Sequence, residues 1–460
     1  MSSVDHDLSQ VQSILDPSEV IPPTSPLYGP NAQGWAVQKD LHPRLVAVPT
    51  SPESLARLIA HLYKSHLHFA IRGQGFLSSS AKDVLVSMTA FDEFHFDPHA
   101  EVATVGAGQT WGAVYRKLKE VAPSYGIVGA RTPAVSVGGT VVTGGLSWLS
   151  AEHGCISDPE NMLDAQVVKF DGSVVWASSE PDLLWTMRGG GGGFGVATKF
   201  LFRVRPYPQA IWAGPILLPR QQLPAVATRL EAFLASNPGP RVSMFLYVIR
   251  ENLLETINAS QDMLVVHAYD ANGEEHGRKT FKWALDIPGA IDQTGITDME
   301  GVTKLQQKVD KSKGTMRQYW APMFLKTLSA ATITRAIELV DELAKQDSAV
   351  SDCTYLIFEL LTLCDAKGSC AWPRPPGAKH VILLGPGCPA NASAEQEEMA
   401  RSLAADASEK ILGTRSVSLL ANGGEEFHDP VMIWGENLDR LRLLKKVYDP
   451  NGRFQGQIRA

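Results

Sequence analysis

The chain has 460 residues, of which 44% are hydrophobic and 20% are charged. These fractions are ordinary for globular proteins and exclude a mainly disordered, collagen-like or coiled-coil chain. Lys and Arg number 42 and Asp and Glu number 49, which gives a net charge of −7, so no basic excess indicates a nucleic-acid partner.

Neither a targeting signal nor a membrane span is predicted. The N-terminus lacks a basic segment followed by an apolar one, and runs such as Val381–Leu384 are too short to cross a bilayer. The five cysteines include no CxxC pair, which favours reduced thiols. His95 and His99 lack a third candidate ligand, so no metal site is predicted. We therefore expect a soluble cytoplasmic protein without a membrane partner.

In the first half of the chain, short strands and helices alternate with glycine-rich turns. Helical spacing of apolar residues predicts helices at Ser51–His66 and Thr110–Val121. Runs rich in Val and Ile, bounded by Gly, Asp or Ser, predict strands at Phe69–Arg72, Val84–Ser87, Ala103–Ala107, Ala165–Phe170 and Val174–Ala177. This alternation indicates an α+β domain of the nucleotide-binding kind.

The prolines that follow, beginning with Pro206, mark a boundary to a second α+β domain. A polar, Lys-rich stretch at Glu274–Lys313 divides this domain. Its predicted helices are Gln221–Ser236 and Ser329–Lys345, with a tail helix at Met432–Tyr448. Its predicted strands are Val242–Ile249, Met263–Asp270, Ser351–Leu363 and His380–Leu384.

Glycine is concentrated in three turns of the first domain, at residues 71–76, 133–145 and 188–195. Of the 39 glycines, 19 lie between Arg72 and Phe200. Such turns are often only tight or flexible connections, but they also aim backbone N–H groups at an anion. The segment Gly106–Trp111 lacks the third glycine of the Rossmann fingerprint. Three glycine-rich turns beside predicted strands favour a large phosphate-bearing cofactor.

These turns and their neighbours, taken in order, resemble a known family. The matching segments are Arg72–Gly75, Val105–Gly112, Pro133–Gly145, Asn161–Ala165, Leu184–Val196, Trp434–Leu441 and Tyr448–Pro450. Together they resemble the FAD-linked oxidases whose FAD-binding domain is of the p-cresol methylhydroxylase or vanillyl-alcohol-oxidase type. Within that family the chain most resembles the berberine-bridge-enzyme-like branch.

The resemblance implies an α+β fold with a two-subdomain FAD-binding domain and an antiparallel substrate sheet flanked by helices. On this plan residues 1–40 are an N-terminal extension and 41–206 form the FAD-binding domain. Residues 207–418 form the substrate domain, and 419–460 return to the FAD domain.

The resemblance also implies which residues hold FAD. The first loop would hold the pyrophosphate through Arg72, Gly73, Gln74 and Gly75, followed by Phe76. The rest of the cofactor site would comprise Thr132, Ser136, Gly138, Gly139, Thr140, Gly145, Val196 and, from the tail, Asn437.

The chain departs from the branch at both covalent flavin anchors. The usual histidine after the first loop is Phe76, and the usual cysteine before the PxV segment is Thr132. We therefore expect non-covalent FAD. The branch's tyrosine base before the closing helix also looks replaced, by Gly423.

Flavin oxidation usually needs a base for the substrate proton. Tyr355 and Glu359 lie four residues apart on a predicted strand and so share a face, and His380 opens the next strand. Glu425 and His428 are further options. For each, an ordinary structural role is the competing interpretation.

Two enzyme functions and one binding function remain open. The first is an FAD-dependent oxidase or dehydrogenase acting on a small organic molecule, such as a secondary metabolite, with molecular oxygen as a candidate acceptor. The second is a non-redox isomerase or cyclase that retains FAD. The third is a binding protein without catalysis, which the intact glycine segments disfavour.

Overall fold

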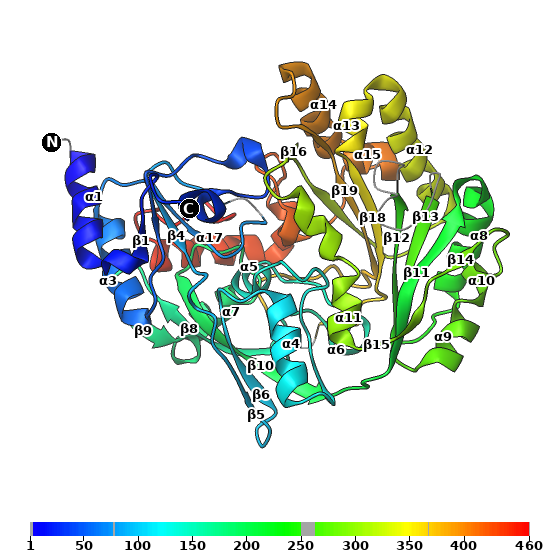
Figure 1. Ribbon diagram of the computed structural model, residues 1–460, viewed down its shortest axis with the longest axis horizontal. Coiled ribbons are helices and arrows are strands. Elements are labelled where there is room, and N and C mark those ends of the chain that lie inside the picture. The colour runs from blue at the N-terminus through cyan, green and yellow to red at the C-terminus, as the bar shows by residue number, and fades with distance from the viewer. Residues whose placement is uncertain (1–2, 77–78, 250–262, 367, 460) are drawn as a thin grey trace.

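The computed structural model describes residues 3–76, 79–249, 263–366 and 368–459 (Figure 1). Its N-terminal sheet has the strand order β1-β2-β4-β3, in which β2, β4 and β3 run parallel. The strands are β1 (Val20–Ile21), β2 (Leu45–Ala47), β3 (Phe69–Arg72) and β4 (Val84–Ser87). The helices of this region are α1 (Ser3–Ile14), α2 (Tyr28–Ala32) and α3 (Pro52–Lys64). The predicted bounds of β3 and β4 are confirmed.

The local sequence explains why α3 forms where it does. Ser51 caps its N-terminus by accepting a hydrogen bond from the Ser54 N–H at 3.1 Å, and Pro52 occupies the first turn. The apolar face of α3, which includes Leu55, Leu58 and Leu62, is fully buried against the parallel strands.

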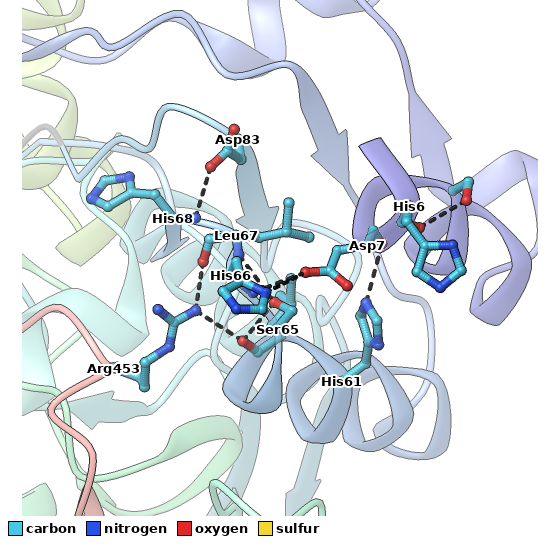
Figure 2. Close-up of polar contacts among 11 residues, drawn as sticks. His6, Asp7, His61, Ser65, His66, Leu67, His68, Asp83 and Arg453 are labelled. Atoms are coloured by element: carbon cyan, nitrogen blue, oxygen red, sulfur yellow. Dashed lines mark hydrogen bonds and ion pairs between the residues drawn. The ribbon is translucent and has the colours of Figure 1, made fainter. Parts of the chain in front are cut away.

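Three distant segments meet at the C-terminal end of α3 (Figure 2). The Asp7 carboxylate on α1 accepts the backbone N–H of His66 at 2.9 Å, and the Asp7 carbonyl lies 3.1 Å from His61 Nε2. From the tail, Arg453 donates to the carbonyls of Leu62 and Leu67. The N-terminal helix and the C-terminal tail thus both bind α3 and the loop that follows it.

The second sheet has the order β5-β6-β10-β8-β9, and β7 also pairs with β10. The long strand β10 alternates between buried and half-buried positions, as expected of a central strand. The strands are β5 (Phe94–Asp97), β6 (Val102–Gly106), β7 (Tyr125–Ile127), β8 (Met162–Val168), β9 (Val174–Trp176) and β10 (Val196–Pro206). The helices are α4 (Trp111–Val121), α5 (Val137–Val142), α6 (Ser150–His153) and α7 (Pro181–Met187).

After Pro206 the chain enters a large antiparallel sheet with the order β14-β11-β13-β12-β18-β19-β17, to which β15 adds beside β11. Its strands are β11 (Ile211–Pro219), β12 (Val242–Ile249), β13 (Met263–Asp270), β14 (Ile291–Asp292), β15 (Gly295–Thr297), β17 (Ala321–Leu325), β18 (Tyr355–Leu360) and β19 (His380–Gly385). A small separate ladder joins β16 (Met316–Gln318) to β20 (Gly387–Pro389).

Helices cover the outer face of the large sheet, the side away from the first two sheets in Figure 1. They are α8 (Leu223–Ala235), α9 (Glu274–Thr280), α10 (Lys282–Leu285), α12 (Ala330–Gln346), α13 (Ser348–Asp352), α14 (Ala394–Ala405) and α15 (Ala407–Leu412). The short α11 (Met299–Lys304) contacts α4 instead. The strand predicted at Ser351–Leu363 is shorter in the structure, where it is β18, because the first predicted residues belong to α13.

The strand register assigns the candidate side chains to faces of the large sheet. Glu359 lies opposite Phe245, and Tyr355 lies four residues earlier on the same strand, so both share one face as predicted. His380 lies opposite Leu360, the residue after Glu359. His380 is therefore on the face opposite to that of Glu359 and Tyr355, so the register does not place it beside these two candidates.

The tail folds back onto the glycine run at residues 189–193. Trp434 donates from Nε1 to the Gly189 carbonyl at 3.0 Å, and Lys445 donates from Nζ to the Gly193 carbonyl at 2.8 Å. A side chain at Gly191 would lie 2.7 Å from the Trp434 ring. The third glycine-rich turn is thus a docking point for the tail and not a flexible loop.

The tail helix predicted at Met432–Tyr448 is interrupted. Gly435 takes a φ of +46°, which separates α16 (Val431–Trp434) from a 3-10 turn and then α17 (Leu438–Tyr448). No helix within the described ranges is long and apolar enough to cross a membrane.

Burial of Lys445 leads to a stability prediction. Its ammonium pairs with the fully buried Asp449 at 2.8 Å and is itself 3% exposed. Lys445→Met leaves the carboxylate without its charge partner, and we expect a loss of about 3–5 kcal/mol in the free energy of unfolding, measured by urea denaturation. The exposed pair Arg442–Asp439 supplies the control, since Arg442→Met should cost about 1 kcal/mol or less. Equal losses in the two variants would contradict this account.

His380 should make the fold sensitive to acid. Burial, helped by Lys379, lowers the pKa of His380 to about 4, whereas an unfolded histidine has a pKa near 6.5. Between those values the unfolded chain binds a proton that the folded chain resists, so stability falls as the pH drops from about 6.5 to 4. His380→Leu should flatten that part of the melting-temperature profile, while replacement of the exposed His99 by Gln should not. Parallel profiles for wild type and His380→Leu would exclude this role.

Candidate cofactor and substrate site

The first glycine loop leaves β3 and meets the start of α5. A side chain at Gly73 would lie 2.4 Å from Ser136 Oγ, so only glycine permits this approach. Gly75 has a φ of +82°, which an L side chain rarely adopts. Among the described residues, none accepts a hydrogen bond from the backbone N–H groups of Gly73, Gln74 or Gly75. The loop therefore presents consecutive unpaired donors, as an anion-binding nest does.

Arg72 lies beneath this loop and is 5% exposed. Its guanidinium donates to the backbone carbonyls of Asn31 and Ala32. Burial lowers the pKa of Arg72 to about 10, against an opposing effect of Asp40. The guanidinium makes no ion pair within the described part of the chain. A buried cation held only by carbonyl oxygens adds positive charge to the loop.

Phe76, which follows the first glycine loop, packs against an aromatic side chain from the N-terminal segment. Its ring stacks on Trp35, with centroids 4.3 Å apart and planes inclined by 22°. The backbone N–H of Trp35 donates to the Gly75 carbonyl at 3.1 Å. Residues 31–36 thus hold the first loop from one side, a contribution that the sequence analysis did not identify.

The second glycine-rich turn serves both the candidate site and the protein's own packing. Ser136 is the N-cap of α5 and faces the first loop, and Thr132 is half-buried nearby in sequence. Thr140 is used internally, because its hydroxyl accepts from Trp111 Nε1 at 2.7 Å and donates to the Ser136 carbonyl at 2.8 Å. Among the glycines, Gly139 is exposed, while Gly145 and Gly138 have close protein neighbours.

Two other predicted cofactor residues are engaged by the protein itself. Val196 is buried with Val168 and Phe454 between the first two sheets. Asn437 donates from Nδ2 to the carbonyls of Cys370 and Ala371, both at 3.2 Å. Asn437 therefore fixes the segment that leads into Trp372–Arg374.

The inner face of the large sheet carries Glu359 and Tyr355. Glu359 lies 2.8 Å from the guanidinium of Arg131, and both side chains are about nine-tenths buried. Arg131 immediately precedes Thr132, so this ion pair joins the large sheet to the second glycine-rich turn. Arg131 Nη1 has no hydrogen-bond partner among the described residues. The Tyr355 hydroxyl is hydrogen-bonded to Ser312 Oγ at 2.6 Å, and burial raises the pKa of Tyr355.

The same face holds residues that sequence analysis did not select. The Tyr247 hydroxyl lies 2.6 Å from His267 Nε2, and burial raises the pKa of Tyr247. Trp148 stacks on Tyr269 and tilts against Phe245. Pairing of the predicted strands Val242–Ile249 and Met263–Asp270 would have brought Tyr247 and His267 together, but only once their register was known.

The segment after Gly423 contains a buried ion pair. Glu425 is held by Lys39 at 2.6 Å, and burial raises the pKa of Glu425. The backbone N–H of Glu425 donates to His428 Nδ1, and burial lowers the pKa of His428 to about 4. Glu425 thus joins the tail to the N-terminal segment, while His428 makes a local contact within the tail.

Arg374, in the Trp372–Arg374 segment, is a structural anchor. It pairs with Asp158 at 2.8 Å and contacts the Cys155 sulfur at 3.0 Å, and both charged side chains are 4% exposed. Beside it, Trp372 fills the space left by the absent side chains of Gly144 and Gly189. These two glycines therefore admit Trp372 and not a ligand.

Two surface hollows lie away from these loops. One of about 180 Å³ is lined by residues of α4 and α11, and another of about 160 Å³ lies beside α6. Both are smaller than the roughly 300–1,000 Å³ of typical ligand pockets. No group of three or more candidate metal ligands occurs in the described ranges.

The donor set at the first loop fits the phosphate-bearing part of FAD. Three unpaired N–H groups, the buried Arg72 and the glycine contact with Ser136 together form a positively polarised cradle. Phosphate groups bind such arrangements of backbone donors and guanidinium.

Comparison with known proteins gives the same cofactor. A family model described as an FAD-binding domain matches residues 43–178. The chain is 34% identical over 225 residues to the FAD-dependent monooxygenase tpcD of Cochliobolus heterostrophus, which covers 46% of this chain and 42% of that protein. It is 24% identical over 461 residues to the FAD-dependent monooxygenase drtC of Aspergillus calidoustus, covering 92% and 83%. The aligned part spans only 49, 42 and 39% of the length of three curated relatives.

Solved structures share the complete fold. 6-Hydroxy-D-nicotine oxidase from Arthrobacter nicotinovorans superposes with a TM-score of 0.80 at 21% identity, over 96% of this chain and 97% of that one. A single-residue variant of berberine bridge enzyme superposes with a TM-score of 0.80 at 15% identity, over 98% of each chain. The chain therefore contains an FAD-binding domain and has the fold of the FAD-linked oxidases that include berberine bridge enzyme.

Proposed function

We propose that the protein is an FAD-dependent oxidoreductase that oxidises a small organic molecule between Thr132 and the inner face of the large sheet. The observation that carries the proposal is the buried Arg131–Glu359 pair, which joins the FAD-binding domain to that sheet. Relatives named as FAD-dependent monooxygenases support redox chemistry and make a secondary metabolite a reasonable substrate.

FAD, when bound, would accept the hydride of the substrate. Glu359 would take the substrate proton on its carboxylate, which Arg131 holds in place. The unpartnered Nη1 of Arg131 is a buried donor suited to an oxygen of the substrate. Tyr355 would stay protonated, because burial raises its pKa, and would donate a hydrogen bond instead of acting as a base.

A non-redox isomerase or cyclase that keeps FAD is the second candidate. The observation in its favour is the loss of both covalent anchors, since Phe76 stacks on Trp35 and Thr132 has no thiol. Anaerobic mixing with a panel of phenols, alcohols, amines and sugars separates the two functions. Bleaching of the flavin band indicates oxidation, and conversion of a compound without bleaching indicates the second candidate.

We expect the flavin to be bound without a covalent bond. Acid precipitation of the purified yellow protein should leave the colour in the supernatant, because Phe76 and Thr132 cannot attach it. Colour in the pellet would contradict this prediction. A colourless protein that takes up no added FAD would contradict the proposed function itself.

Glu359→Gln should keep the flavin bound but slow its anaerobic reduction by about 10²–10⁴-fold, the usual contribution of a general base. The readout is the single-turnover rate of bleaching with the panel compound that reduces the wild type. Glu338→Gln, on the exposed side of α12, is the matched control and should leave the rate unchanged. A Glu359→Gln rate within a factor of about two of wild type would remove Glu359 from the mechanism.

A further inference from the structure

Lys313 stands out as a cation whose backbone is fixed but whose charge is not neutralised. It lies between the 3-10 helix Gln307–Ser312 and β16. On one side Ser312 bonds the Tyr355 hydroxyl, and on the other the Gly314 N–H donates to the Trp35 carbonyl at 2.8 Å. Both neighbours of Lys313 are therefore held, one by the large sheet and one by the N-terminal segment.

The segment that holds Lys313 also holds the first FAD loop. Gln33 donates from Nε2 to the Gly314 carbonyl at 3.4 Å, and Ala36 bridges to Met316. Immediately before Gln33, the carbonyls of Asn31 and Ala32 accept the guanidinium of Arg72. Trp35 thus bonds both Gly314, next to Lys313, and Gly75 of the first loop, so residues 31–36 connect the two segments.

The charges at this point are not balanced by the protein. Lys313 is half-buried, and its ammonium has no ion-pair or hydrogen-bond partner in the part of the chain that the structure describes. Burial and then the charge of Arg72 lower the pKa of Lys313. The charge of Asp40 acts to raise the pKa of Arg72. In the described ranges, however, Asp40 forms an ion pair with neither Arg72 nor Lys313. Two neighbouring cations without a paired carboxylate are costly unless an anion lies between them.

The unpaired N–H groups of residues 73–75 identify the class of that anion. Phosphate oxygens accept from backbone N–H groups and from cationic side chains together. We propose that Lys313 is a ligand of the FAD pyrophosphate, supplied by the substrate domain to the first glycine loop. This inference rests on the FAD-binding part of the proposed function and extends the site beyond the loops of the FAD-binding domain.

The test measures how tightly the holoenzyme retains FAD. Dilution of the yellow protein releases flavin, whose fluorescence rises on leaving the protein and gives the dissociation constant without any turnover. Lys313→Met should weaken FAD binding about tenfold to a hundredfold, the usual range for a hydrogen bond to a charged group. Lys313→Arg keeps the charge and should stay close to wild type. The exposed neighbour Lys311 provides the matched control, since Lys311→Met should not change retention.

Each other outcome is informative. Unchanged FAD retention in Lys313→Met overturns the inference. Equal weakening by Lys311→Met, or a loss in Lys313→Arg as large as in Lys313→Met, also overturns it, because a specific ammonium–phosphate contact predicts neither. A wild-type protein that binds no FAD is a different result, since it removes the proposed function as well.

Discussion

The close approach of backbone at the glycine run 189–193 is the constraint on which the architecture depends. With side chains at these positions, Trp372 and Trp434 could not enter, and Lys445 could not reach the Gly193 carbonyl. Those contacts bring the segment that carries Trp372 and the tail onto the glycine run. In the sequence this glycine run indicates a ligand-binding loop. In the structure it is mainly a contact surface for other parts of the same chain.

The candidate site is built from segments far apart in the chain. The N-terminal segment contributes Trp35, the second glycine-rich turn contributes Arg131, and the large sheet contributes Glu359. None of them is a local motif, and each acquires a role only through a partner on another element. The buried Arg131–Glu359 pair favours one orientation of the second glycine-rich turn relative to the large sheet. Removing either partner would leave an uncompensated charge.

Local sequence predicted much of the fold and little of the chemistry. The bounds of β3, β4, β12 and β13 follow from short apolar runs between turn residues, and α3 and α4 begin after their Ser51 and Thr110 caps. The face of Glu359 followed from alternation along one strand, whereas that of His380 required the pairing of β18 with β19. Asn437 shows the same limit. Its motif matched, but its side-chain amide donates hydrogen bonds to carbonyls that only the tertiary fold brings near.

The tail contacts have a consequence for biosynthesis. The Gly191 carbonyl accepts the N–H of Gln457, and Lys445 bridges Gly193 to the Phe454 carbonyl, so the third glycine turn waits for residues 445–457 before its contacts can form. Lys445 follows Gly193 by 252 residues, and all the strands of the large antiparallel sheet are synthesised in between. In a nascent chain the glycine turn therefore lacks these partners while the large sheet is made, and its contacts with the tail form only after residues 445–457 have been synthesised.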